Sequence, residues 1–360
     1  MLTVHGCRGR QKRLIEALAK LNLDGAVITH RDHVHYFANF RPHWNQVAAA
    51  LIETTGRVTL VGHGFKKEEI AADELAEFPA RFGATMTSDQ AVRAAEVVKK
   101  LMPGGKKFGA DLEGPAALVR AAGHTKDITS EILRLRKRKD ADEIVCMKHA
   151  IAACEAMYDY VKRVIKPGLN ELELFGQLKS IAAVSAGQDP ERFGNDFCCG
   201  QGGGLPRSRP MQAGELYVLD LGPSYDGYHA DNCRTFAADR KGTDVQHKAC
   251  AKIMASLAFL EKQIKPGLSA KALFQMGKEF LADAGHSGLC HHLGHGVGLQ
   301  PHESPQINPD YDAVFEVGDT FTMEPGLYSK ELNAGIRLEQ QYLLTEKGIE
   351  RLTSFPLELV

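Results

Sequence analysis

The 360-residue sequence lacks the features that direct a chain to a membrane or to a nucleic acid. Its formal net charge is only −1, from 44 basic and 45 acidic residues, whereas such partners favour a basic excess. No apolar run approaches the roughly 18 residues that a membrane-spanning helix needs. Residues 1–20 also lack the apolar stretch of a secretory signal and carry helical periodicity instead. We therefore expect a soluble protein with no nucleic acid and no membrane among its partners.

Cysteine is present, but in no pattern that builds a site. The eight cysteines are scattered, Cys198 and Cys199 are adjacent, and no CxxC pair occurs. In a chain of this length such a pattern is typical of reduced thiols in a cytosolic protein rather than of a disulfide framework. The sequence therefore predicts a cytoplasmic protein without a cysteine-based zinc site.

The N-terminal third of the sequence is typical of a small α/β domain. Short apolar runs bounded by turn residues predict strands, and apolar residues at helical spacing predict helices between them. The predicted strands are 25–29, 47–53, 57–62 and 106–111, and the predicted helices are 10–22, 66–78, 91–102 and 115–123. Strands that alternate with helices favour a partly parallel sheet.

A domain boundary is expected near residue 135, because a chain of 360 residues is long for one core. The charge-dense stretch LRLRKRKDADE (133–143) leads into a long helical pattern that ends at a Pro-Gly pair. The acidic residues after its basic run favour a solvated linker and a helix start over a nucleic-acid patch. We therefore expect one domain at 1–135 and a second at 136–360.

The second domain contains an internal repeat. Residues 165–187 (IKPGLNELELFGQLKSIAAVSAG) resemble residues 264–285 (IKPGLSAKALFQMGKEFLADAG), at an offset of 99 residues. In both copies Pro-Gly ends one helix, and Asn170 or Ser269 can cap the next. Duplicated halves usually pack around a pseudo-twofold axis, so we expect equivalent segments of the two copies to meet near the centre of the domain.

Both copies carry a carboxylate in a strand-like run just before a glycine. YVLDLG contains Asp220 and FTMEPG contains Glu324, and a second carboxylate follows in each copy, at Asp231 and Glu339. Taken singly, each is better explained as a turn or edge residue. Four carboxylates that converge in a core, however, repel one another unless a cation neutralises them. With one imidazole they suit two divalent metal ions.

The stretch HHLGHGVGLQPHESP (291–305) holds four histidines and three glycines. It does not fit the helical zinc motif, because His292 stands where that motif has glutamate and because glycine disfavours a helix. It also lacks the GxGxxG and GK[ST] patterns of phosphate-binding loops. What remains is a glycine-permitted turn that places one or more imidazoles against the carboxylates.

These motifs together resemble the pita-bread metallopeptidase family, whose members include methionine aminopeptidase, aminopeptidase P, prolidase and creatinase. The resemblance rests on HxxxHGxG followed by HExP, the aspartates eleven residues apart, MEPG and GIRLE, and it covers about residues 138–360. HYFANF (35–40) also resembles a segment of the creatinase/prolidase N-terminal domain. The resemblance implies an α/β (α+β) protein. Its C-terminal domain is a pita-bread (creatinase-like) catalytic domain with a pseudo-twofold repeat, and a smaller α/β creatinase-type domain precedes it.

The resemblance also implies roles for individual residues. It implies a dinuclear metal centre with five ligands, which are Asp220, Asp231, His295, Glu324 and Glu339. In the family pattern Asp231 and Glu339 bridge the two ions. Asp220 binds one ion, and His295 and Glu324 bind the other. Glu324 also handles the proton of the bridging water or hydroxide.

Three further residues match substrate-contacting positions of the family. His302 matches the histidine that contacts the substrate and the tetrahedral intermediate. His291 matches a substrate-pocket histidine of the aminopeptidase P and prolidase branch, and Arg337 matches that branch's arginine near the second carboxylate. His292 and His229 match no role, so a surface or hydrogen-bonding position is expected for both.

The sequence departs from the family in the loop before Asp220. The peptidases usually carry a histidine there, whereas this chain has none between His149 and His229 and carries Arg207 after a Leu-Pro pair. Arg207 or Arg209 can instead present a cation to an anionic substrate group, and each fits a solvated loop position equally well.

We therefore expect a cytoplasmic, homodimeric metallohydrolase of the Xaa-Pro aminopeptidase or dipeptidase type. Its expected cofactors are two divalent metal ions, manganese first and cobalt, zinc or iron as alternatives, which generate hydroxide beside the substrate carbonyl. The altered loop keeps a second hypothesis open, in which the same fold acts on a compact anionic or zwitterionic small molecule as an amide hydrolase or lyase. A non-catalytic binding protein is a third hypothesis, and the intact ligand set argues against it.

Overall fold

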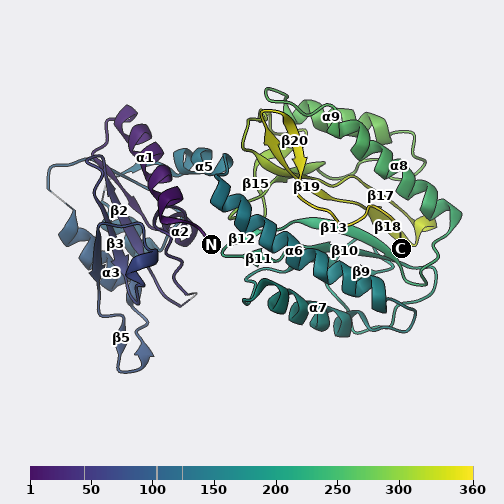
Figure 1. Cartoon of the computed structure of the whole chain (residues 1–360), viewed down its shortest axis with the longest axis horizontal. Helices are drawn as coiled ribbons and strands as arrows, with labels where there is room; N and C mark the ends of the chain where they lie inside the picture. The colour runs from purple at the N-terminus through teal and green to yellow at the C-terminus, as the bar shows by residue number, and fades with distance from the viewer. Residues whose placement is uncertain (44, 103, 124, 360) are drawn as a thin grey trace. The chain divides into compact units, whose positions relative to one another are not determined.

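The structure is a computed structural model that describes residues 1–43, 45–102, 104–123 and 125–359 (Figure 1). The chain divides into two compact units, Met1–Arg136 and Lys137–Val360, which we call the N-terminal and C-terminal units. Over the described residues, every helix is too short or too polar to cross a bilayer.

The N-terminal unit is built on one six-stranded sheet with the order β4-β3-β2-β1-β7-β8. Its strands are β1 (Gly25–Ile28), β2 (Ala49–Glu53), β3 (Val58–Gly62), β4 (Glu74–Glu77), β7 (Phe108–Ala110) and β8 (Lys126–Asp127), with a small hairpin of β5 (Arg81–Phe82) and β6 (Thr85–Met86). Its helices are α1 (Val4–Lys20), α2 (Arg31–Ala38), η1 (Lys67–Glu69), α3 (Gln90–Leu101), α4 (Ala116–Ala121) and α5 (Thr129–Lys137). β1 is parallel to β7 and antiparallel to β2, so the prediction of a partly parallel sheet is confirmed.

The predicted helix at 66–78 is wrong. Lys67–Glu69 forms a single 3-10 turn, and Glu74–Glu77 forms the strand β4, parallel to β3 with Leu75 opposite Leu60. Glutamate and alanine favour a helix locally, but helix propensities of ordinary residues differ by less than about 1 kcal/mol. Backbone pairing with the edge of β3 satisfies the polar groups of both segments, and it prevails over that weak local preference.

The C-terminal unit repeats one arrangement of paired helices and strands. Its helices are α6 (Ala141–Val164) and α7 (Glu171–Ala186) in the first half and α8 (Asp244–Glu261) and α9 (Ala270–Leu281) in the second. The predicted caps are confirmed, since the side chain of Asn170 accepts backbone N–H groups at the start of α7 and that of Ser269 does so at the start of α9. In Figure 1, α7 lies below the strands of this unit, and α8 and α9 lie above them.

Each half of the C-terminal unit contributes its own sheet, with the orders β13-β10-β9 and β15-β14-β16-β19-β20. The strands of the first half are β9 (Gly194–Cys199), β10 (Leu216–Leu221), β11 (Ser224–Tyr225), β12 (Tyr228–His229) and β13 (Asn232–Ala237). Those of the second half are β14 (Gly294–Gly296), β15 (Glu303–Ile307), β16 (Thr320–Met323), β17 (Gly326–Ser329), β18 (Ala334–Arg337), β19 (Gln340–Thr345) and β20 (Gly348–Arg351), with the short helix η2 (Lys330–Leu332). Leu174 of α7 packs with Phe197 in one core, and Leu273 of α9 packs with Phe321 in the other. The two halves therefore each have an apolar core.

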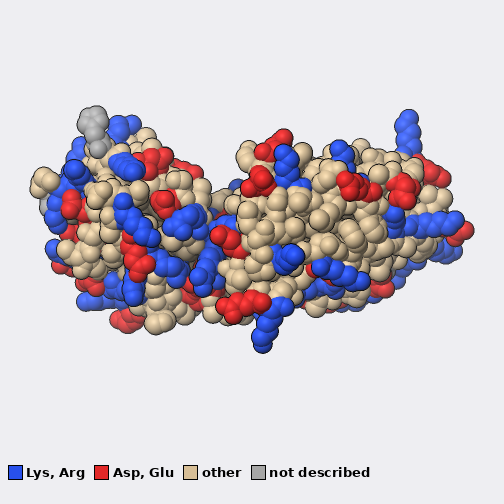
Figure 2. Space-filling model, turned by 90° about the horizontal axis from the view of Figure 1, so that it is seen from above, with Lys and Arg blue, Asp and Glu red and all other residues tan. Residues whose placement is uncertain are grey.

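The surface and the cysteines agree with the composition. Basic and acidic side chains are interspersed over the face drawn in Figure 2, in keeping with the formal net charge of −1. All eight cysteines are free, seven of them buried and Cys290 exposed. The prediction that the cysteines form no disulfide framework is confirmed.

Candidate metal centre

A pocket of about 480 Å³ opens in the C-terminal unit, and both halves of the repeat line it. It brings together eight residues singled out in the sequence, which are Asp220, Asp231, His291, His295, His302, Glu324, Arg337 and Glu339. The other lining residues are Asn195, Asp196, Gly202, Gly203, Cys290, His292 and Tyr328. Segments that lie more than a hundred residues apart in the sequence thus meet in one cavity.

In the first half of the unit, two neighbouring strands carry the aspartates. Asp220 lies in β10, and Asp231 directly precedes β13. The two strands are antiparallel, with Leu221 opposite Asn232. This pairing holds the two carboxylates at the same end of the strand pair.

In the second half, three strand ends supply the remaining side chains. His295 is the middle residue of β14, Glu324 directly follows β16, and Glu339 lies between β18 and β19. The backbone N–H of Glu324 donates to the carbonyl oxygen of Leu293 at 2.8 Å, and that of Glu339 donates to the carbonyl oxygen of Cys233 in β13 at 3.0 Å. The second bond joins the two halves of the repeat beside the pocket.

His295 presents one ring nitrogen to the carboxylates. Its Nδ1 lies 3.0 Å from the carbonyl oxygen of Gly296 and donates to it, so in the neutral ring Nε2 carries the lone pair. Nε2 is 3.6 Å from Asp231 Oδ2 and 3.4 Å from Glu324 Oε1. Ligand atoms of Asp231, His295 and Glu339 lie within 4.8 Å of one another. A histidine that binds a metal through one ring nitrogen usually donates the N–H of the other ring nitrogen to a carbonyl or carboxylate oxygen, as His295 does here.

Burial and mutual repulsion oppose the charges of three pocket carboxylates. Burial, followed by the charges of neighbouring carboxylates, raises the pKa of Asp231 and of Glu339 well above the ordinary range. Burial also raises the pKa of Asp220 to about 6, although the charge of Arg337 acts in the opposite direction. The positively charged side chains of the protein therefore do not neutralise all of the negative charge of these carboxylates.

Glu324 differs from its neighbours because two imidazoles contact it. Burial acts to raise its pKa, but the hydrogen bond from His292 and the close contact with His295 outweigh burial, and the pKa lies well below the ordinary range. His292 Nε2 is 2.9 Å from Glu324 Oε1. Glu324 is therefore the carboxylate that the protein itself keeps ionised.

The pocket fits divalent metal ions. Asp220 Oδ1 and Glu339 Oε2 are buried and have no hydrogen-bond partner among the described residues. A buried charge without a partner is costly, and a cation is what these oxygens lack. Carboxylate oxygens with one imidazole form a donor set that manganese, iron, cobalt and zinc ions accept.

A chain of hydrogen bonds runs along one wall of the pocket. Arg337 Nη1 donates to the hydroxyl oxygen of Tyr328 at 3.1 Å, and that hydroxyl donates to His291 Nε2 at 3.0 Å. His291 Nδ1 in turn donates to the carbonyl oxygen of His292 at 2.7 Å. Every member is satisfied when His291 is neutral, and burial lowers the pKa of His291 in favour of that form.

Arg337 also joins carboxylates of the first half. Its Nη2 pairs with Asp196 of β9 and with Asp220 Oδ2, the latter at 2.7 Å. Asp196 Oδ1 accepts the backbone N–H of Gly204 at 2.6 Å. The guanidinium thereby fixes the orientation of Asp220, as partners of metal ligands commonly do.

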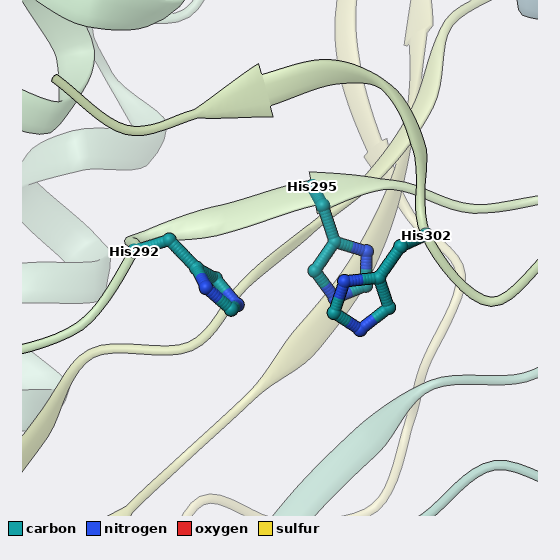
Figure 3. Close-up of side chains that lie close together, drawn as sticks. All are labelled: His292, His295 and His302. Atoms are coloured by element: carbon teal, nitrogen blue, oxygen red, sulfur yellow. The ribbon is translucent and has the colours of Figure 1, made fainter. Parts of the chain in front are cut away.

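Three histidines extend toward the same space in Figure 3. The ring of His302 stacks on that of His295, with centroids 3.7 Å apart and planes inclined by 13°. The hydrogen bond with Glu324 raises the pKa of His292. Partial desolvation and the neighbouring imidazoles lower the pKa of His302 to about 4. The pocket therefore holds His302 neutral and favours the protonated form of His292.

His292, Asp196 and Tyr328 are pocket residues to which the sequence assigned no site role. For His292 the expected hydrogen-bonding position is confirmed, but the bond lies inside the pocket rather than on the surface. The histidine doublet ahead of β14 was a usable signal for it. Asp196 and Tyr328 carried no signal, because only the packing of β9 and β17 brings them to the pocket. His229 is buried in β12, so a surface position is wrong for it.

The two loop arginines bind carboxylates of the chain itself. Arg207 donates to Glu171 through Nε and Nη2, at 3.1 and 2.8 Å, and Arg209 pairs with Glu215. Both arginines also donate to the carbonyl oxygen of Cys199. Within the described part of the chain, neither is among the residues that line the pocket. These ion pairs give both arginines structural contacts, and their contact with an anionic substrate group stays a prediction.

His295 lies on a strand and not in the glycine-permitted turn that the sequence favours. A Cβ atom at Gly294 would lie 2.1 Å from the carbonyl oxygen of Thr322, and one at Gly296 would lie 2.2 Å from that of Ser304. The glycines are needed because the strands on either side of β14 approach too closely for any side chain.

Comparisons with known proteins agree over both units. Residues 145–346 match the family described as Metallopeptidase family M24, and residues 10–137 match the Creatinase/Prolidase N-terminal domain. An Xaa-Pro dipeptidase of Pyrococcus horikoshii is 26% identical over an alignment of 359 residues that covers 97% of this chain and 98% of that protein. An Xaa-Pro dipeptidase of Lactobacillus helveticus is 31% identical over 237 residues, 64% of each chain.

Solved structures show the same fold. The prolidase of Pyrococcus horikoshii superposes with a TM-score of 0.80 at 24% identity and covers 98% of this chain and 100% of its own. An Xaa-Pro dipeptidase of Bacillus anthracis superposes with a TM-score of 0.81 at 23% identity, over 98% and 99% of the two chains. The predicted pita-bread fold with a creatinase-type N-terminal domain is confirmed. The match over residues 145–346 spans more than half of the chain and includes the whole pocket from Asn195 to Glu339. The chain therefore belongs to metallopeptidase family M24.

Proposed function

We propose that this chain is a dinuclear metal-dependent peptidase of the Xaa-Pro type, an aminopeptidase or dipeptidase that releases an N-terminal residue ahead of proline. The observation that carries the proposal is the meeting of four buried carboxylates and His295 in one pocket, with two carboxylate oxygens left without partners among the described residues. The relatives named Xaa-Pro dipeptidase support the substrate class.

The proposed ligands are the five residues of the family pattern, Asp220, Asp231, His295, Glu324 and Glu339. Divalent ions held there supply a Lewis acid for the scissile carbonyl group and lower the pKa of water toward neutrality. The neutralising charge of the ions also relieves the repulsion that raises the pKa of the buried carboxylates. We propose manganese as the native metal, with cobalt, zinc and iron as alternatives that the same donors accept.

Glu324 is the residue we propose to move protons. It is hydrogen-bonded to His292 through Oε1, and its Oε2 lies 3.9 Å from Arg337 Nε. A carboxylate held ionised by such partners can accept a proton from the attacking water and return it to the leaving nitrogen. Proline nitrogen needs this proton to leave as a neutral amine.

His302 and His291 are the residues we propose to contact the substrate. His302 is exposed at the pocket and rests on the ring of His295, so it can donate an N–H to a carbonyl oxygen that gains negative charge. His291 is fixed by its bonds to Tyr328 and to the backbone. We propose that the Arg337–Tyr328–His291 chain forms a rigid wall against which the substrate is positioned.

The small-molecule hypothesis keeps only part of its support. The missing loop histidine still sets this chain apart from the usual peptidases. The two loop arginines, however, are neutralised by Glu171 and Glu215, so they do not favour an anionic substrate. The intact donor set does not favour a non-catalytic binding protein. We therefore retain the peptidase and test the small-molecule substrates beside it.

We further propose that the protein is a homodimer and that it works in the cytoplasm. The free cysteines, seven of them buried, support a reducing compartment. Sedimentation equilibrium of the purified chain tests the dimer, and a mass of one chain at all concentrations contradicts it. Immunoblotting of cell fractions tests the compartment, and a secreted protein contradicts it.

The test of the peptidase is release of the first residue from Xaa-Pro substrates by the metal-loaded chain. Alanyl-proline and an alanyl-prolyl tripeptide separate the dipeptidase, which cleaves the first alone, from the aminopeptidase, which cleaves the longer substrate. Alanyl-alanine tests the preference for proline. Each substrate is offered with manganese, cobalt, zinc and iron ions in turn.

The matched control is the E339Q variant, which replaces a proposed ligand by a neutral side chain of the same size. We expect it to be inactive with every metal. If the unaltered chain turns over none of the peptides with any of the four ions, the proposal is wrong. Turnover confined to small amides or sulfonium acids selects the second hypothesis.

A further inference from the structure

The N-terminal unit contains another group of side chains of the types that bind metal ions, histidine and glutamate. They lie at the carboxyl ends of two parallel strands. His30 lies two residues after β1, His33 lies in the first turn of α2, and Glu113 lies three residues after β7. β1 and β7 are paired with Val27 opposite Ala110, so the loops that follow them lie side by side. The carboxyl ends of parallel strands are a common place for ligand sites.

Asp111, the first residue after β7, fixes the ring of His33. The buried carboxylate accepts the backbone N–H and the hydroxyl of Thr29, both at 2.6 Å, and the backbone N–H of His30 at 2.9 Å. Its Oδ2 lies 2.7 Å from His33 Nδ1. Burial acts to raise the pKa of Asp111, but His33 and the other donors lower it overall. Asp111 is therefore an ionised acceptor, and His33 donates through Nδ1.

Two imidazole nitrogens are left buried without a hydrogen-bond partner among the described residues, His33 Nε2 and His30 Nδ1. The side chain of His33 is 0% exposed, and its Nε2 lies 3.9 Å from Glu113 Oε2. One ligand atom each from His30, His33 and Glu113 lie within 4.8 Å of one another. Ligand atoms around tetrahedral Zn²⁺ lie roughly 3.3 Å apart, as bond lengths of about 2.0–2.1 Å require. The side chain of Glu113 is half-exposed, so it has room to move toward the two imidazoles.

A protonated His33 between Asp111 and Glu113 is the competing explanation. It leaves the contact with Glu113 too long for a hydrogen bond, since 3.9 Å exceeds the usual range. It also places a charged ring beside His30, whose ring centroid is 5.0 Å away. Burial and the proximity of His33 lower the pKa of His30. His30 Nδ1 and His33 Nε2 are both buried without a hydrogen-bond partner among the described residues, and a cation can bind to both nitrogen atoms.

We propose that His30, His33 and Glu113 bind a Zn²⁺ ion in the N-terminal unit, with Asp111 as the positioning residue for His33. Two imidazoles and one carboxylate suit Zn²⁺, whereas Mg²⁺ and Ca²⁺ prefer oxygen ligands alone. The exposure of Glu113 leaves room for water as the fourth ligand. The ion links the loop after β1, the start of α2 and the loop after β7, and it stabilises the N-terminal unit. All three proposed ligands belong to the N-terminal unit.

Zinc binding by the full-length chain tests the proposal. Equilibrium dialysis against buffered Zn²⁺ counts the ions bound per chain at each free concentration. We expect E113A and H30A to lose one class of sites, or to weaken it at least about tenfold. H5Q is the matched control, because His5 is an exposed histidine of α1 in the same unit, and it is expected to bind like the unaltered chain. Identical titrations of the unaltered chain and E113A overturn the proposal.

Anomalous diffraction at the zinc edge locates the ion. A peak between His30, His33 and Glu113 in crystals of the unaltered chain supports the proposal, and peaks confined to the pocket of the C-terminal unit overturn it. Neither readout depends on peptide turnover. The E339Q variant separates the two sites further, because it is expected to keep the class of zinc sites that E113A loses.

Discussion

Replacement of Arg337 by methionine removes a guanidinium that pairs with both Asp196 and Asp220 inside the pocket. Methionine keeps much of the apolar stem and none of the charge. Arg337 is only 7% exposed, so water does not readily replace the lost hydrogen bonds. The variant therefore tests whether this cation holds the carboxylates of the first half in place.

The expected effect is large, because removal of one partner from a buried ion pair costs about 3–5 kcal/mol. We expect the free energy of unfolding of the metal-free R337M protein to fall by that amount. Metal-loaded protein is expected to lose less, since bound cations compensate Asp220. Arg337 also opposes the effect of burial on the pKa of Asp220. Its loss is therefore expected to lower kcat/KM about 10- to 100-fold, as for other residues that orient a metal ligand.

Urea unfolding with and without Mn²⁺ measures the stability, and alanine release from the Xaa-Pro peptide that the unaltered chain cleaves measures kcat/KM. R337K is the matched control, because lysine keeps the charge but not the planar fork that reaches two carboxylates. It is expected to lie between R337M and the unaltered chain. An R337M protein that unfolds like the unaltered chain and keeps its kcat/KM is incompatible with the proposed role of Arg337.

Three further changes test the fold around the sites. Asp111→Asn is expected to lower the free energy of unfolding by at least about 3 kcal/mol at pH 7, because the amide nitrogen of Asn cannot accept the hydrogen bonds that Oδ2 accepts from the backbone N–H of His30 and from His33 Nδ1. The folded-state pKa of Asp111 is lowered, so this stability is present above its unfolded pKa of about 4 and is lost as the pH falls through the folded value. Denaturant unfolding over a series of pH values from 7 downward checks that the difference between the two proteins narrows in acid. Arg234→Met leaves the buried carbonyl oxygen of Glu339 and the amide oxygen of Gln340 without their donor, and a loss of about 1–3 kcal/mol or more in the same assay is expected. Gly296→Ala places a Cβ atom 2.2 Å from a carbonyl oxygen of β15, and both activity and Tm are expected to fall, whereas Gly176→Ala in α7 has open space and leaves activity unchanged.

The fold of the C-terminal unit can be predicted from the sequence because the same motifs occur in both halves in the same order. IKPGL occurs at equivalent points of both halves, and Asn170 and Ser269 cap α7 and α9 as expected. The two carboxylates of each half can be identified from the sequence alone, because the first of them stands at the same point of a strand-like run in both halves. Their repetition indicates a cation site, since buried like charges are costly without a compensating ion.

Tertiary contacts account for what the sequence does not reveal. Residues 74–77 pair with β3 against their helical propensity, and local pattern cannot show which strand edge is available. Asp196 lies in a strand, β9, that carries no recognisable motif, and only the packing of β9 in the folded protein brings it to Arg337. The sequence shows that Arg207 is a cation but not which anion it binds, and only the structure shows that its partner is Glu171.

The rate of alanine release from alanyl-proline and from an alanyl-prolyl tripeptide by the Mn²⁺-loaded chain, measured beside the E339Q variant, tests the proposed dinuclear centre and its substrate class together. We predict that the unaltered chain cleaves at least one of the two peptides, that a chelator abolishes the reaction, and that E339Q is slower by more than about a hundredfold, since even partners of metal ligands cost 10- to 100-fold. Equal rates for the two proteins, or no alanine released from either peptide by the unaltered chain, would contradict the proposal.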